Sequence, residues 1–182
     1  MKAHLRLLFA GGAMLVLLLA LVACSGGGQR AHFPTGQMVT ATVPAGQQTV
    51  VALPSGSSAT FPAGAFAANT HVTVSEMLGG EERDAATFPQ GSGLLLGALS
   101  ITAAPGAAVH QDLTVVLVLE KACTPGEQFV VFQFNPAHHV WESAGSAVAQ
   151  VGADGQMATF TANTTGLTEL EVSYGVFENL HP

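Results

Sequence analysis

The sequence predicts an all-β protein, an antiparallel β-sandwich that follows an N-terminal signal peptide. Three observations predict this fold class. The second part of the chain is made of about ten short apolar or Thr-rich runs, at roughly 8–12-residue spacing. Gly, Pro, Asn and Asp separate the runs, and no segment has the periodicity of an amphipathic helix. Several runs are apolar on one face only, which favours a sandwich over a barrel.

The first 23 residues have the composition of a secretory signal peptide. Lys2 and Arg6 give a positive start, residues 7–23 carry no charge, and the side chains become smaller toward Ala23. Such segments are removed on export. An uncleaved membrane anchor is one alternative, but 17 apolar residues lie at the lower limit for a span. A buried core helix is another, but a soluble helix should show a polar face.

The end of this segment, Leu21-Val22-Ala23-Cys24, resembles the lipobox of bacterial lipoproteins. The resemblance implies a diacylglyceryl group on the Cys24 thiol, cleavage before Cys24 by signal peptidase II, and acyl chains such as palmitate at the new N-terminus. Two chains make stable attachment possible, whereas one chain anchors only marginally. The residue after the cysteine is Ser25 and not an Asp. By the same resemblance, this implies export to the outer membrane if the cell is Gram-negative. We therefore expect an extracytoplasmic, lipid-anchored protein of the cell envelope.

Three parts of the chain follow from this interpretation. Residues 1–23 are the signal peptide, residues 24–37 are the lipidated Cys24 and a flexible tether containing three consecutive glycines, and residues 38–182 are a single β-sandwich domain. The 159 residues left after cleavage are long enough to bury about 70% of the unfolded surface.

Charge excludes some classes of partner. Cleavage leaves three strong bases, Arg30, Arg83 and Lys121, against 12 acids, so the net charge of the mature chain is −9. Nucleic-acid binding would need a basic face. Attraction to anionic lipid headgroups would also need basic clusters, so covalent lipid is the expected membrane contact.

The expected strands are the runs between turn residues. They cover residues 38–43, 48–53, 57–61, 71–77, 93–103, 113–119, 128–134, a strand starting at 140, 147–151, 157–162 and 168–174. Runs 113–119 and 128–134 are apolar on both faces, which is typical of central strands. Asp154-Gly155 lies between two runs and predicts a hairpin. Residues 78–92 hold three glycines and a charge cluster, so we expect the longest exposed loop there, with one helical turn.

One stretch resembles the ZU5 family. Residues 57–66 read Ser-Ser-Ala-Thr-Phe-Pro-Ala-Gly-Ala-Phe, and Thr-His-Val-Thr-Val follows at 70–74. The residues themselves predict that Pro62 ends strand pairing, that Gly64 takes a conformation barred to other residues, and that Phe61 and Phe66 enter the core. Residues 130–141 and 164–168 are similar to later strands of bacterial proteins with this motif. The resemblance implies a ZU5-like or immunoglobulin-like sandwich, and an interaction module as in the animal members, although no binding residue of theirs matches here.

The search for chemistry argues against an enzyme, and we assign no catalytic, cofactor-binding or metal-binding residue. Gly-x-Ser-x-Gly, a phosphate-binding Gly-Lys-Ser/Thr and a dinucleotide fingerprint are missing from the sequence. His138-His139 with Glu142 is the best metal candidate, but adjacent strand residues point to opposite faces, which favours exposed turn histidines. His110 and Asp112 could face the same way, with no nucleophile beside them.

The remaining side chains of note have structural interpretations. Cys123 lies in a turn and has no disulfide partner if Cys24 carries lipid, so we expect a half-buried thiol, with a reactive one as the alternative. Five aromatic residues fall on strands at inward spacing and are expected in the core, with a ligand platform as the alternative: Phe129, Phe132, Phe134, Trp141 and Phe160.

The function expected from the sequence is that of a non-enzymatic envelope lipoprotein. The domain would serve as a structural or protein-binding module, and its partner would be another envelope protein or a surface polymer. The alternative is an envelope protein that binds a small ligand, a glycan or a metal through the 78–92 loop or the His138-His139 turn.

Overall fold

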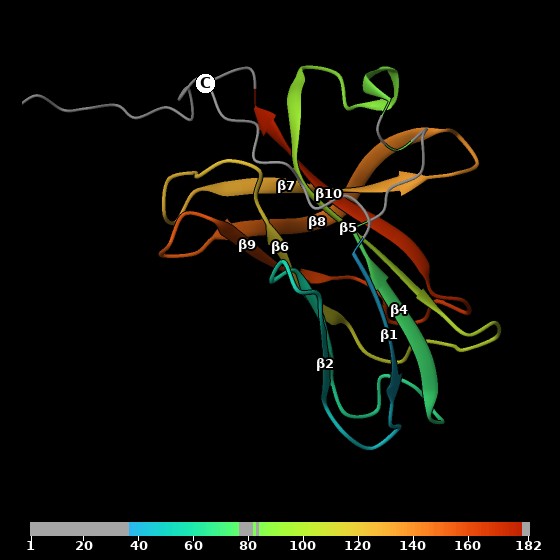
Figure 1. Cartoon of the computed structure of the whole chain (residues 1–182). Coiled ribbons are helices and arrows are strands. Elements are labelled where there is room, and N and C mark those ends of the chain that lie inside the picture. Colours follow the sequence, from blue (N-terminus) through green and yellow to red (C-terminus); the bar gives the residue numbers. More distant parts are fainter. Residues whose placement is uncertain (1–36, 77–81, 83, 180–182) are drawn as a thin grey trace, which may run out of the picture.

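The computed structural model describes residues 37–76, 82 and 84–179, and these residues form an all-β fold, which confirms the predicted class (Figure 1). The strands are β1 (Met38–Val43), β2 (Thr49–Ala52), β3 (Ser58–Phe61), β4 (Thr70–Ser75), β5 (Ser92–Ala103), β6 (Leu113–Val118), β7 (Gln128–Asn135), β8 (Val140–Val151), β9 (Met157–Ala162) and β10 (Glu171–Asn179). A short 3-10 helix, η2 (Ala85–Thr87), lies between β4 and β5. Within the described ranges, no helix has the length and apolar character that a membrane crossing needs.

All strand pairs are antiparallel and belong to one sheet, in the order β1-β4-β5-β10-β7-β8-β9-β6-β3-β2. The sheet curls so far that its two edge strands, β1 and β2, come close to each other, giving a nearly closed barrel (Figure 1). No strand pairing joins these two edges in the described residues. The two layers expected of a sandwich are therefore the two walls of a single curled sheet.

The main core fills the inside of the curl. Alternate residues of each strand point inward, as a period of two requires. The largest fully buried side chains are Phe61, Leu96, Leu99, Ile101, Leu113, Leu117, Leu170 and Tyr174. The opposite walls approach closely at Gly97 of β5, where an added Cβ would lie 2.8 Å from the carbonyl oxygen of Val118 in β6.

A second, aromatic cluster lies on the opposite face of β5, β7, β8 and β10. It contains Ala98, Phe134, Trp141 and Phe177, with Phe88, Leu95 and Phe132 packed against them. The ring of Phe177 makes edge-to-face contacts with Phe88, Phe132 and Trp141, at centroid distances of 4.9, 5.4 and 5.4 Å. Val131 and Val176 belong to the main core, so their strand neighbours Phe132 and Phe177 must face the other way. The predicted burial is confirmed for Phe129 and Phe160 in the main core and for Phe134 and Trp141 in the aromatic cluster, whereas Phe132 is half-buried beside that cluster.

β1 and β9 agree with the prediction at both ends, and most other strand boundaries agree to within two residues. Two strands differ by more. β8 is one continuous strand of 12 residues, with a register shift that skips residues 144–147 against β7. β10 begins three residues later than predicted and continues past Gly175, because the absent side chain of Gly175 makes room for the Trp141 ring.

The ZU5-like stretch has the local geometry predicted from its residues. β3 ends at Phe61, directly before Pro62, and Gly64 has a φ of 81° in the left-handed region that favours glycine. Phe61 and Phe66 are both buried and stack at a centroid distance of 5.8 Å. This geometry confirms the predicted turn.

Candidate functional site

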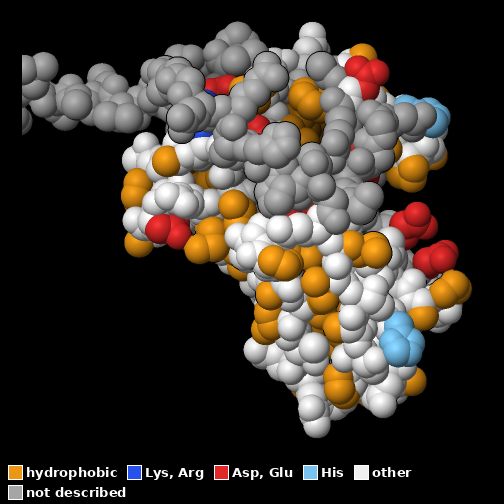
Figure 2. Space-filling view, in the orientation of Figure 1, with side chains coloured by type: hydrophobic (Ala, Val, Ile, Leu, Met, Phe, Trp, Pro, Cys, Tyr) orange, Lys and Arg blue, Asp and Glu red, His pale blue; other side chains and the backbone are white. Residues whose placement is uncertain are grey.

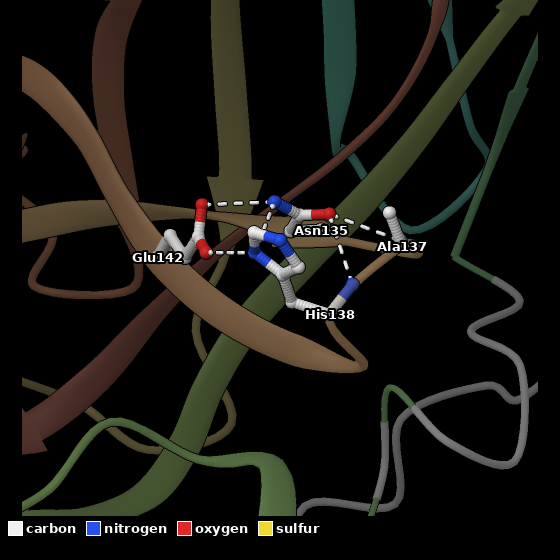
Figure 3. Close-up of polar contacts among 4 residues, drawn as sticks. All are labelled: Asn135, Ala137, His138 and Glu142. Carbon is white, nitrogen blue, oxygen red and sulfur yellow. Dashed lines mark hydrogen bonds and ion pairs between the residues drawn. The ribbon is translucent and has the colours of Figure 1, made fainter.

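The predicted metal candidate lies in the turn between β7 and β8, where four residues are tied together (Figure 3). The side-chain oxygen of Asn135 accepts hydrogen bonds from the backbone N–H groups of Ala137 and His138, at 3.0 and 3.3 Å. The Asn135 amide nitrogen donates to Glu142 Oε2 at 3.0 Å, and His138 Nδ1 lies 2.9 Å from Glu142 Oε1. These contacts close the hairpin across its two strands.

Electrostatics fit this closing role. Hydrogen bonds from Asn135, and then from His138, hold the pKa of the Glu142 carboxyl below its ordinary value. Both His138 and Glu142 are largely exposed to solvent. The described residues hold no group of three or more His, Cys, Asp or Glu side chains placed to bind one metal ion. The arrangement therefore fits a hairpin clasp, with His139 in the left-handed conformation at a φ of 55°.

His110 and Asp112, the second pair from the sequence, lie before β6, and Asp112 has a clear structural partner. Its Oδ1 accepts three hydrogen bonds: from Thr164 N at 3.0 Å, Thr165 N at 2.9 Å and Thr165 Oγ1 at 2.7 Å. These bonds, led by the Thr165 backbone N–H, lower the pKa of Asp112. Asp112 thus fastens the turn after β9 to the start of β6.

The Asp112 charge reaches into the main core. Burial, and secondarily the nearby Asp112 carboxylate, raise the pKa of the Tyr174 phenol to about 12. Tyr174 lies at the centre of β10, between Leu99 of β5 and Gln133 of β7. The negative charge of Asp112 therefore adds to the effect of burial on the Tyr174 phenol.

Asp112 also lines a pocket, together with polar residues on β8, on β9 and just after β9. The pocket has a volume of about 440 Å³, and its lining is Asp112, Ala144, Ser146, Ala147, Val148, Thr161 and Asn163. The sequence pointed to Asp112 as a candidate but gave no sign that the other polar residues meet it here. Their meeting depends on where β8 parts from β9, which no local pattern encodes.

The 78–92 loop is described only at Glu82 and 84–92; residues 77–81 and 83 lie outside the described part. The predicted helical turn is confirmed as η2, which Asp84 begins by accepting hydrogen bonds from Ala86 N and Thr87 N. The Trp141 indole N–H donates to the Glu82 carbonyl oxygen at 3.0 Å, and Phe88 packs on Phe177. The described part of the loop is thus the cover of the aromatic cluster.

Two further polar or reactive groups are buried. Cys123 is 7% exposed, its thiol lies 3.6 Å from the Lys121 carbonyl oxygen, and it forms no disulfide within the described residues. Glu76, which the sequence did not single out, is 5% exposed and accepts a hydrogen bond from Ser55 Oγ at 2.6 Å, while its other oxygen has no partner in the described part. Its place at the end of an alternating strand gave no sign of burial.

No family model, curated protein or solved structure matches this chain. The ZU5-like and lipobox resemblances therefore stay predictions from the sequence motifs.

Proposed function

We propose that this chain is a lipid-anchored protein of the cell envelope, and that its β domain is a non-enzymatic structural or protein-binding module. The observation that carries the proposal is the sequence Leu21-Val22-Ala23-Cys24 at the end of a basic and then apolar segment. The anchor would be the diacylglyceryl group on Cys24, and the location the extracytoplasmic side of a membrane, the outer one in a Gram-negative cell.

The position of the first strand supports a tethered domain. β1 begins at Met38, 14 residues after Cys24. A fully extended chain of that length spans at most about 50 Å. Such a tether would let the domain stand clear of the lipid headgroups and meet partners in the surrounding space.

The bonding of the candidate residues supports a non-enzymatic role. His138, Asn135 and Glu142 bond to one another across a hairpin, and Asp112 holds the Thr164-Thr165 turn. Catalytic acids, bases and nucleophiles need a reacting group within hydrogen-bond reach in a shared site. Here the polar side chains serve two different turns.

The surface supports an uncharged partner, such as another envelope protein or a neutral surface polymer. Figure 2 shows hydrophobic side chains and few charged ones around β1, β2 and β4, in the lower half of the view. Val130 and Val148 lie directly opposite each other on β7 and β8, and each is 46% exposed. We propose this valine pair as the first position to probe in crosslinking of intact envelopes.

Cleavage of the precursor by signal peptidase II and lipid attachment at Cys24 test the proposed anchoring. Globomycin, which blocks signal peptidase II, should make a larger precursor accumulate, and Cys24→Ala should abolish lipid attachment. Cys123→Ala is the matched control, because it removes the other cysteine and should be processed like the wild type. A precursor whose mass and amount do not respond to globomycin would contradict the proposal.

A further inference from the structure

The pocket beside Asp112 exists because two strands part. β8 pairs with β9 at Gln150↔Thr159 and Val151↔Ala158. Toward its start, β8 bulges at residues 144–147 and pairs with β7, while β9 continues beside β6. The space left between them is the pocket of about 440 Å³, within the roughly 300–1,000 Å³ range of small-molecule sites.

Several polar side chains around this opening carry hydrogen-bond acceptors that receive no hydrogen bond from the described residues. Asp112 Oδ1 takes three hydrogen bonds, but its Oδ2 takes none from the described residues. The side chains of Ser146, Thr161 and Asn163 likewise make no hydrogen bond within the described part of the chain. A carboxylate only accepts, and hydroxyl and amide oxygens can also accept. No Lys, Arg or His lines the pocket to balance the carboxylate.

We propose that the Asp112 pocket binds a primary ammonium group, carried either by a small amine or by a lysine side chain. An ammonium presents three donors and no acceptor, which matches a lining of one carboxylate, two hydroxyls and one amide oxygen. Ala144, Ala147 and Val148 give the aliphatic stem that carries the ammonium an apolar surface to lie on. This inference does not depend on the lipid anchor.

Asp112 is prepared for this role by its own bonds. The three donors on Oδ1 fix the orientation of the carboxylate, so little side-chain entropy is lost when Oδ2 accepts a ligand. A calcium ion would need about six to eight oxygen ligands, and the pocket supplies one carboxylate. A neutral polyol could use the same acceptors but would leave the charge unbalanced.

Titration calorimetry on the full chain in detergent tests the proposal with three probes: cadaverine, Nα-acetyl-lysine methylamide, and a pentanediol with the same carbon chain as cadaverine. Both amines should bind at least about tenfold more tightly than the diol. Tighter binding of cadaverine would identify a small amine as the ligand class, and tighter binding of the lysine amide would identify a lysine of a partner. Equal binding of the diol, or no binding of either amine at about 50 mM, would overturn the proposal.

Variants of the chain locate the binding. Asp112→Asn keeps the acceptor for the three structural hydrogen bonds and replaces Oδ2 by a donor, so amine affinity should fall at least about tenfold. Asp154→Asn is the matched control, because it removes the same charge from the exposed turn at the other end of β9 and should change affinity less than about twofold. Thr161→Val preserves the shape on an exposed strand position and should weaken binding about threefold or more. Equal losses in Asp112→Asn and Asp154→Asn, or none in Asp112→Asn and Thr161→Val, would overturn the site.

Discussion

At the residue scale, Tyr174 is the most useful reporter of the core. It is the one tyrosine in the sequence, it is 1% exposed, and its pKa is about 12. Its phenolate absorbance should therefore rise near pH 12, whereas an exposed tyrosine titrates near pH 10. A midpoint near 10 in the folded protein would contradict the burial of the ring.

The same shift predicts how stability depends on alkaline pH. The folded pKa of Tyr174 lies above the unfolded value of about 10, so folding favours the neutral phenol. This contribution is complete below pH 10 and is lost as the pH rises from 10 to 12, by about 2 kcal/mol at the upper limit. Urea unfolding at pH 9, 10 and 11 measures it, and Tyr174→Phe, which cannot ionise, should remove this part of the pH dependence.

Asp112 contributes to the Tyr174 pKa, which offers a second check on the pocket geometry. Asp112→Asn should lower the Tyr174 titration midpoint, because the nearby negative charge is gone, while burial still holds it above the ordinary value. Asp154→Asn, with its side chain in the turn after β8, should leave the midpoint unchanged. An identical midpoint in all three proteins would contradict the proximity of the carboxylate and the phenol.

At the element scale, β10 connects the two hydrophobic clusters. Val176 belongs to the main core, Phe177 belongs to the aromatic cluster, and Gly175 lies under Trp141. A Cβ at Gly175 would lie 3.0 Å from ring atom Cζ3 of Trp141 and 3.0 Å from Leu95 Cδ1, which is too close for either group to stay in place.

Gly175→Ala should therefore lower the free energy of unfolding by about 1–2 kcal/mol, through overpacking. Trp141 is the one tryptophan in the sequence, so its fluorescence reports both unfolding and the displacement of its ring. Gly46→Ala, in the turn between β1 and β2, is the control, because an added Cβ there meets no atom within 4 Å. Equal stability of the two variants would contradict the packing of the aromatic cluster.

Strand patterns in the sequence were sufficient for most of the fold. The apolar or Thr-rich runs between turn residues predicted both ends of β1 and of β9. Asp154-Gly155 correctly predicted the hairpin that joins β8 to β9. The second half of β10 was not predicted, because glycine ordinarily weakens a strand and Gly175 follows the predicted end. The packing of Gly175 against Trp141 is a tertiary contact, which the local sequence does not show. The Asp112 pocket could not be predicted, since it arises where β8 changes neighbours, 30 or more residues along the chain from Asp112.

At the scale of the whole molecule, closure of the sheet decides which surfaces remain for partners. The curl leaves two strand edges, β1 and β2, and an outer face with few charges. Sheet edges can pair with other chains, and close approach of the two edges limits access to them. The outer face and the Asp112 pocket are then the surfaces through which a tethered domain would act.

We propose that covalent lipid at Cys24, and not the polypeptide itself, holds this protein on the cell. Intact-mass spectrometry of the protein purified from membranes tests it most directly. We predict a chain that starts at Cys24 and carries the added mass of a diacylglyceryl group and an N-terminal acyl chain. A chain that still starts at Met1, or one with an unmodified Cys24 thiol, would contradict the claim.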